Sequence, residues 1–210
     1  MDVLAIFRFV SPLFRRRRMK AFINQLNPGS EDRILDVGGY LEFWADSGIE
    51  SFITILNVHP ISNPVSNSKI TTVIGDGTDL KYADNSFDIV FSNSVIEHLG
   101  TFERQQQLAS ECARVGKRLW IQTPARSFPI EPHFLTPLIH YFPKSWRKKM
   151  LRNCTVWGWL VRPSDKQIED ALDEIHLLSN REMKALFPGC AIERERILGL
   201  TKSYIAVREG

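Results

Sequence analysis

The segment Arg33-Ile34-Leu35-Asp36-Val37-Gly38-Gly39 constrains the fold of this chain more than any other stretch. Its polar start gives way to apolar residues, which indicates a short buried strand, and the glycine pair permits a turn that bulkier residues would not. In open α/β sheets, ligands bind just beyond the carboxyl ends of the strands. A glycine turn there lets backbone N–H groups approach a ligand closely. We therefore expect the later strands to deliver polar residues to the same edge.

The rest of the chain continues an alternation of strands and helices. Further strands are predicted at residues 52–58, 70–74, 87–92, 117–123, 191–197 and 203–208, from their β-branched and aromatic content. A helix is predicted over 102–115, and Ser179 to Glu182 has the spacing of a capping box that begins another. His59 to Ser68 is predicted to be a loop. The acidic stretch Asp165 to Glu174 is expected to be a solvated helix face, with pairing to the basic residues of 132–164 as the open alternative. With 210 residues, the chain is long enough for one domain with one sizeable core.

Two later segments give the strand pattern a family resemblance. Gly75-Asp76-Gly77-Thr78 follows the third strand, and Phe87-Asp88-Ile89-Val90-Phe91-Ser92-Asn93-Ser94-Val95-Ile96-Glu97-His98-Leu99 contains the fourth. Their order and spacing resemble the class I S-adenosylmethionine-dependent methyltransferases of the small type-11 kind, from about Arg33 to Thr123. The resemblance implies an α/β, Rossmann-like fold: a doubly wound, seven-stranded, mostly parallel sheet, here with a helical, aromatic-rich insertion after strand five.

The same resemblance implies S-adenosylmethionine as cofactor, with S-adenosylhomocysteine as product. It places the methionine part of the cofactor at the turn after the first strand, the ribose at the end of the second, and the adenine amino group beyond the third. The cofactor-site residues that it implies are Asp36, Gly38, Gly39, Asn57, Asp76, Gly77, Thr78, Asn93 and Ser94.

The chain departs from the family pattern at two of these places. Tyr40-Leu41-Glu42 stands where a third glycine is usual, and Asn57 stands where a carboxylate usually binds both ribose hydroxyls. An amide oxygen still accepts a hydrogen bond, but without charge assistance. Because of these departures, a second interpretation stays open: a methyltransferase-like domain that binds cofactor or lipid but catalyses no reaction. They also count against a nicotinamide dehydrogenase, which would need a fuller glycine motif and an acid about 20 residues further on.

The best candidate for catalysis is Ile130-Glu131-Pro132-His133-Phe134, which follows the fifth strand. An unperturbed histidine pKa of about 6.5 suits a general base, so we predict that His133 is catalytic and that Glu131 orients it or binds sugar hydroxyls. The alternative for His133 is a loop histidine with an ordinary structural role. His98 is expected to cap or pack. We assign no metal ligand, although a hydroxyl acceptor would need either a base or a metal.

Basic residues gather in two segments. Residues 1–20 hold six basic residues and one acid, and residues 132–164 hold six and none, so the rest of the chain is near −8 while the net charge is +3. We divide the chain into a basic helical segment (1–30), a methyltransferase domain (31–124 and 177–210) and an inserted lid or substrate-binding segment (125–176). Within the first segment, Val3, Ile6, Phe7 and Val10 form one helical stripe, and Ser11-Pro12 is predicted to start a second helix.

These charges suggest the partners. A basic, tryptophan-rich lid favours a small-molecule, glycan-linked or lipid-linked acceptor with an anionic or sugar group. A nucleic acid is the second acceptor class, but the acidic core and the absence of a base-flipping tetrad at Asn93 count against it. Arg15 to Arg18 are either a solvated helix face or an anchor on an anionic membrane surface. The sequence leaves the oligomeric state undetermined.

The compartment follows from what the sequence lacks. No apolar run approaches the ~20 residues of a membrane-spanning helix, and no cleavable leader is evident. The three cysteines (Cys112, Cys154 and Cys190) are scattered without metal-ligand spacing and are expected to be reduced thiols. We expect a cytoplasmic protein; the alternative is a protein that also associates peripherally with the inner face of the membrane.

Overall fold

The computed structural model describes residues 3–45, 47–60, 68–131, 133–134 and 136–210, and for residues 3–14 and 45 it describes the backbone alone. Most of the loop predicted over His59 to Ser68 lies outside the described residues, as does Pro132. The side chains of the predicted stripe at Val3, Ile6, Phe7 and Val10 also lie outside them.

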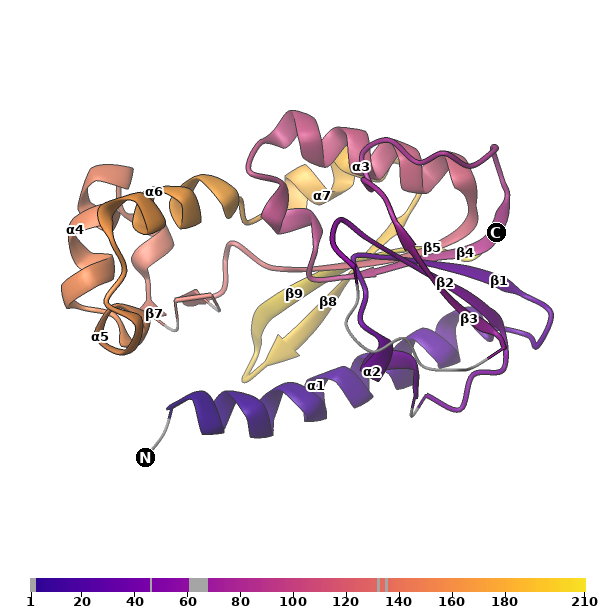
Figure 1. Ribbon diagram of the computed structural model, residues 1–210, viewed down its shortest axis with the longest axis horizontal. Helices are drawn as coiled ribbons and strands as arrows, with labels where there is room; N and C mark the ends of the chain where they lie inside the picture. Colours follow the sequence, from indigo (N-terminus) through magenta and orange to yellow (C-terminus); the bar gives the residue numbers. More distant parts are fainter. Residues whose placement is uncertain (1–2, 46, 61–67, 132, 135) are drawn as a thin grey trace.

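A seven-stranded sheet forms the centre of the molecule, in the order β3-β2-β1-β4-β5-β9-β8 (Figure 1). Its strands are β1 (Arg33–Val37), β2 (Phe52–Asn57), β3 (Ile70–Ile74), β4 (Phe87–Asn93), β5 (Gly116–Pro124), β8 (Ala191–Ile197) and β9 (Leu200–Arg208). Strands β1 to β5 are parallel to one another, and β9 runs antiparallel to both β5 and β8. The predicted seven-stranded, mostly parallel sheet is confirmed.

One face of the sheet is covered by α3 (Phe102–Val115) and α7 (Asn180–Leu186) (Figure 1). Successive side chains of a strand point to opposite faces, so Leu35 and Val37 of β1 pack on this side with Leu108 of α3. The predicted range of α3 is confirmed. So is the capping box of α7, in which Ser179 and Glu182 bond each other's backbone N–H groups.

The other face is covered by α1 (Val3–Leu26) and α2 (Leu41–Ala45) (Figure 1). Phe22 of α1 is fully buried in an aromatic cluster with Trp44, Phe91 and Trp120, and the rings of Phe91 and Trp120 stack 5.0 Å apart. The prediction that Ser11-Pro12 begins a second helix is wrong: α1 is continuous across it. Proline removes one helical hydrogen bond, which the long packed helix tolerates here. Within the described residues no helix has the length and apolar character needed to cross a bilayer.

Residues between β5 and α7 form a separate unit beyond the carboxyl end of β5 (Figure 1). Its elements are β6 (Ile130–Glu131), β7 (Thr136–Pro137), the 3-10 turn η2 (Ile139–Tyr141), α4 (Lys144–Asn153), α5 (Val156–Val161) and α6 (Asp165–Glu174). Phe134, Ile139, Leu151, Ile168 and Leu172 give this unit a small apolar core of its own.

Helix α6 was expected to present a solvated acidic face, with pairing to the basic segment as the open alternative. The pairing is what the structure contains. Three ion pairs join α4 to α6: Lys144 with Asp173, Lys148 with Glu169, and Arg152 with Asp165. Much of the positive charge of this segment is therefore matched within the unit.

Candidate functional site

The carboxyl ends of the parallel strands meet at one edge, where the order of the sheet reverses between β1 and β4. Strand β1 continues to β2 on one side and has β4 on the other, which is the topological switch point of an open α/β sheet. The predicted residues of β1, β2 and β4, namely Asp36, Gly38, Gly39, Asn57, Asn93 and Ser94, all lie at or just beyond this edge.

The turn after β1 has no room for side chains. Gly38 has a φ of +74°, and a Cβ atom there would lie 2.5 Å from Cγ2 of Val95. A Cβ atom on Gly39 would lie 1.7 Å from Oδ2 of Asp36. Both positions therefore require glycine, because the side chains of Val95 and Asp36 fill the space beside them.

Asp36 lies beneath this turn and is almost completely buried. Its Oδ2 atom accepts a 2.5 Å hydrogen bond from Nε1 of Trp44, whereas Oδ1 has no partner among the described residues. Burial raises the pKa of Asp36 to about 7, and the bond from Trp44 opposes this only in part. A buried carboxyl with one unmatched oxygen is suited to a cationic or hydrogen-donating ligand.

Both polar atoms of the Asn57 side chain, at the end of β2, form hydrogen bonds with the backbone. Its Nδ2 atom donates to the carbonyl oxygen of Gly39 at 3.2 Å, and its Oδ1 atom accepts from the N–H of Val58 at 2.9 Å. The second lone pair of Oδ1 remains for a ligand.

Asp76 after β3 is held as a carboxylate. Its Oδ1 atom accepts from both the N–H and the hydroxyl of Thr78, and its Oδ2 atom accepts from Arg104 at 3.2 Å. The backbone bond from Thr78 is the main cause that lowers the pKa of Asp76. Gly77 packs closely, since a Cβ atom there would lie 2.7 Å from Cγ1 of Val37.

At the end of β4, Asn93 has a partner that was not expected. Arg18 of α1 is buried, and its guanidinium donates to Asn93 Oδ1 at 3.0 Å, to Glu195 at 2.9 Å and to Ser203 at 3.1 Å. Ser94 has a φ of 60° and donates from Oγ to Oε1 of Gln122 at 2.9 Å. The structure thus adds Arg18 to this edge, although its three preceding arginines are exposed.

A second group of polar residues joins the turn η1 (Ile96–Leu99) to β6 and α6. Nδ1 of His133 lies 2.6 Å from Oε1 of Glu131. Nε2 of His133 lies 3.2 Å from Nε2 of His98, whose Nδ1 lies 2.9 Å from Oε1 of Glu174. Sequence reasoning missed His98 and Glu174 as members of this group, because the contacts span segments far apart in the chain.

The carboxyl groups of Glu131 and Glu97 also belong to this cluster. Oε2 of Glu131 accepts from the N–H of Phe134 at 2.6 Å. Glu97 is fully buried; its Oε2 accepts from the hydroxyl of Thr123 at 2.9 Å, while Oε1 has no partner among the described residues. Burial disfavours the charged form of His133, but the bond to Glu131 and the surrounding carboxylates outweigh it and raise the pKa of His133.

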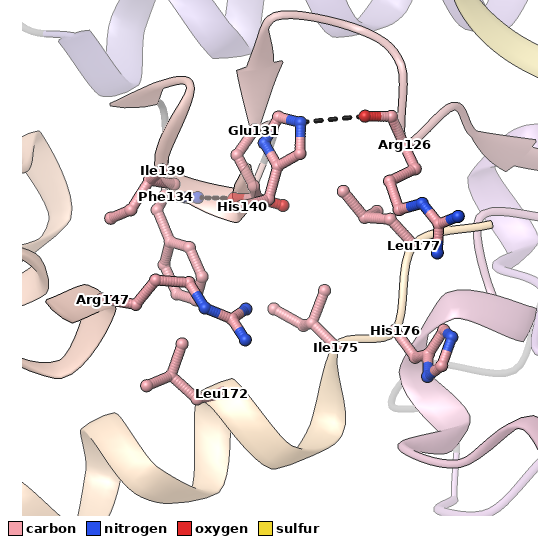
Figure 2. A pocket seen from close by; sticks show the side chains of 10 residues that line it. All are labelled: Arg126, Glu131, Phe134, Ile139, His140, Arg147, Leu172, Ile175, His176 and Leu177. Atoms are coloured by element: carbon pink, nitrogen blue, oxygen red, sulfur yellow. Dashed lines mark hydrogen bonds between the residues drawn. The ribbon is translucent and has the colours of Figure 1, made fainter. Parts of the chain in front are cut away.

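A pocket of about 180 Å³ opens beside this cluster, and its lining residues all lie in the segment from Arg126 to Leu177 (Figure 2). Arg147 of α4 and Arg126, which follows β5, line opposite sides of it. Nε of Arg147 is buried without a partner among the described residues. The remaining lining residues are Glu131, Phe134, Ile139, His140, Leu172, Ile175, His176 and Leu177. Nη1 of Arg126 donates to Glu182 at 3.1 Å, so it is mainly Arg147 that favours an anionic ligand group.

Comparisons with known proteins agree with this geometry. The family described as a methyltransferase domain matches residues 35–119. No curated protein sequence matches the chain.

Several solved structures share the fold at low identity. Phosphoethanolamine N-methyltransferase 2 of Haemonchus contortus, solved with phosphomonomethylethanolamine and S-adenosylhomocysteine, is 16% identical with a TM-score of 0.56, over 85% of this chain and 38% of its own. A protein of Galdieria sulphuraria, described as a candidate sarcosine dimethylglycine methyltransferase, is 17% identical with a TM-score of 0.54, over 88% and 63%. A protein of Bordetella parapertussis, described as a candidate exported protein, is 13% identical with a TM-score of 0.61, over 95% and 68%.

The present chain thus spans 38% of the length of the Haemonchus enzyme, and at these identities the likeness concerns the fold. The sheet order, the glycine turn at its switch point and the match over residues 35–119 support one assignment. Residues 35–119 match the family of methyltransferase domains, and the fold of the chain is one that it shares with solved methyltransferases.

Proposed function

We propose that this chain transfers a methyl group from S-adenosylmethionine to a small-molecule, glycan-linked or lipid-linked acceptor that carries an anionic group. The observation that carries the proposal is the position of Glu131. One of its oxygens orients His133, and the same residue lines the pocket that contains Arg126 and Arg147. A proton-accepting imidazole and an anion-binding pocket are therefore adjacent.

The residues at the carboxyl edge fit the cofactor. Gly38 and Gly39 carry no side chains of their own, and the unmatched Oδ1 of Asp36 lies beneath their turn. Asp76 supplies an ionised acceptor for an amino group, and Asn57 supplies an uncharged oxygen for a ribose hydroxyl. When bound, S-adenosylmethionine supplies the methyl group and its sulfide leaving group.

The contribution of the protein is mainly alignment and proton removal. The side chains of the lid hold the acceptor so that its nucleophilic atom faces the glycine turn, which lowers the entropic part of the barrier. In this proposal Nε2 of His133 receives the proton of an acceptor hydroxyl, and Glu131 stabilises the imidazolium that forms. Residues 125–176 act as a lid that excludes water from this space.

Calorimetric titration with S-adenosylmethionine and S-adenosylhomocysteine tests the cofactor assignment. We expect micromolar binding that weakens at least tenfold in Asp76→Ala and is unchanged in Asp79→Ala. The latter is a matched control, because Asp79 is an exposed acid of the same loop and pairs with exposed Lys81. No binding at millimolar ligand would overturn the proposal in favour of a non-catalytic binding domain, the alternative that Asn57 suggests.

The acceptor step has its own test. Methyl transfer from labelled cofactor into pools of small anionic metabolites, lipid-linked glycans and RNA would identify the acceptor class. We expect His133→Ala to lose most of the turnover while cofactor affinity is kept. Full turnover in His133→Ala, or label found only in RNA, would contradict the proposed acceptor step.

A further inference from the structure

We propose that Glu97, His98 and His133 form a binding site for a divalent transition-metal ion, with Zn²⁺ as the reference ion. The three residues come from the turn η1 and from the segment after β6. Each offers one ligand atom, and these three atoms lie within 4.8 Å of one another.

When both rings are neutral, no hydrogen bond explains how the two histidines face each other. Nδ1 of His133 and Nδ1 of His98 each lie against a carboxylate oxygen, at 2.6 Å and 2.9 Å. An ionised carboxylate only accepts, so each Nδ1 carries a hydrogen. In neutral rings both Nε2 atoms then present lone pairs to each other across 3.2 Å.

This separation suits two ligands of one ion. Two imidazole nitrogens at about 2.05 Å from a tetrahedral Zn²⁺ lie about 3.3 Å apart. The observed 3.2 Å between the Nε2 atoms is close to that value. A cation between them turns the repulsion of two lone pairs into two coordination bonds.

The surroundings of the rings also match a metal site. Histidines that ligate metals usually donate their other N–H to a carboxylate, which fixes the tautomer and the ring orientation. Glu131 stands behind His133 in this way, and Glu174 stands behind His98. Both rings therefore have the supporting carboxylate that such sites use.

The environment of Glu97 supports the metal site independently of the two histidines. Its side chain is fully buried, and its Oε1 atom has no hydrogen-bond partner among the described residues. An unmatched carboxylate oxygen in the interior is costly unless a donor or a cation meets it. If the distances between the three ligand atoms shortened by no more than about 1.5 Å, all three atoms could bind one ion.

Two imidazoles and one carboxylate favour Zn²⁺ or another late first-row ion over Mg²⁺, which prefers oxygen ligands. His98 is more than one third exposed, so a coordination position can remain open toward solvent. If the proposed methyl transfer holds, the ion would bind the acceptor oxygen there and lower its pKa. His133 would then act through the ion and not as a free base.

Zn²⁺ binding to the full-length, chelator-dialysed protein tests the site without any assay of activity. We expect one equivalent by calorimetry, and a Co²⁺ adduct with the visible absorption of tetrahedral coordination. His98→Ala and His133→Ala should each weaken Zn²⁺ binding at least tenfold, and Glu131→Gln about tenfold. His59→Ala is the control, because His59 is an exposed histidine outside the cluster.

Folding is monitored separately, since Glu97 is buried. Glu97→Gln keeps an acceptor for Thr123 and should preserve the circular dichroism spectrum while it weakens Zn²⁺. Zn²⁺ should raise the melting temperature of the wild type and not that of His98→Ala. Absence of binding, or equal binding by both histidine variants and the wild type, would overturn the site.

The outcomes for the metal and the cofactor are distinguishable. Cofactor binding without Zn²⁺ binding would refute the metal site and leave the proposed methyl transfer standing. Zn²⁺ binding without cofactor binding would support the metal site and refute the proposed methyl transfer.

Discussion

Nη1 of Arg18 donates a 3.0 Å hydrogen bond to Oδ1 of Asn93, across 75 positions of sequence. The same guanidinium pairs with Glu195 of β8, so the N-terminal helix is fastened both to the cofactor edge and to the far side of the sheet. Helix α1 is therefore an integral part of the sheet's cover and of the site's rim.

Arg18→Ala should destabilise the protein far more than Arg17→Ala. Side-chain exposure is only 10% for Arg18 and 11% for Glu195, so the substitution leaves a largely buried carboxylate without its main partner. Removal of one member of a buried pair costs about 3–5 kcal/mol, and we expect about 2–4 kcal/mol here because Lys202 lies near Glu195 as well. Urea unfolding of the two variants measures the difference, and equal midpoints would contradict it.

The same contact changes how membrane binding should be tested. Arg15, Arg16 and Arg17 are exposed, whereas replacement of Arg18 would disturb the fold. We expect the triple change of these exposed residues to Ser to weaken binding to vesicles of anionic lipid by about 100-fold, at ~1 kcal/mol per arginine. Sedimentation with neutral vesicles serves as the control, and unchanged binding to anionic vesicles would end the membrane hypothesis.

Asp36 should make stability depend on pH. Its folded-state pKa of about 7 is above the unfolded value of about 3.9, so the folded protein binds the extra proton and stability falls as the pH rises between them. Asp36→Asn removes this effect. We expect the free energy of unfolding of the variant to gain about 2–3 kcal/mol over the wild type between pH 5 and pH 8.

Asp88→Asn is the matched control for that experiment. The hydrogen bond from Lys117 is the main cause that lowers the pKa of Asp88, so this carboxyl stays ionised in both states throughout that pH range. The difference between Asp88→Asn and wild type should therefore be constant from pH 5 to pH 8. A constant difference for Asp36→Asn as well would contradict the raised pKa.

The sheet could be predicted from the sequence because its signals are local. A strand such as Arg33–Val37 shows as a run of apolar residues, and Thr101 and Ser179 begin α3 and α7 by bonding backbone N–H groups three residues ahead. The parallel strands then bring their carboxyl ends to one edge, and Asp36 and Asn93 both lie there.

What could not be predicted depends on contacts between distant segments. Arg18 differs from Arg17 only in the direction it takes from the helix, and one position in a run of four arginines carries no such information. The approach of His98 to His133 is likewise set by where the inserted unit folds back on η1. Pro12 gave a wrong prediction, since the helix expected to begin there is continuous with the residues before it.

Arg147 should determine affinity for the anionic part of the acceptor. Its buried Nε atom lines the pocket and meets no partner among the described residues, so an anion would gain a charge-assisted hydrogen bond. Such bonds contribute about 1.5–3 kcal/mol, so Arg147→Ala should weaken anion binding by about 10- to 100-fold.

Inorganic phosphate is a suitable probe for this prediction, and its binding can be followed by NMR through the arginine Nε–H signals. Lys149→Ala on the exposed part of the same helix should leave phosphate binding unchanged, and Arg147→Lys should restore part of it. Equal phosphate affinity in Arg147→Ala and Lys149→Ala would show that the pocket does not select an anion through this residue, whereas unchanged cofactor affinity in both would confine any loss to the acceptor side.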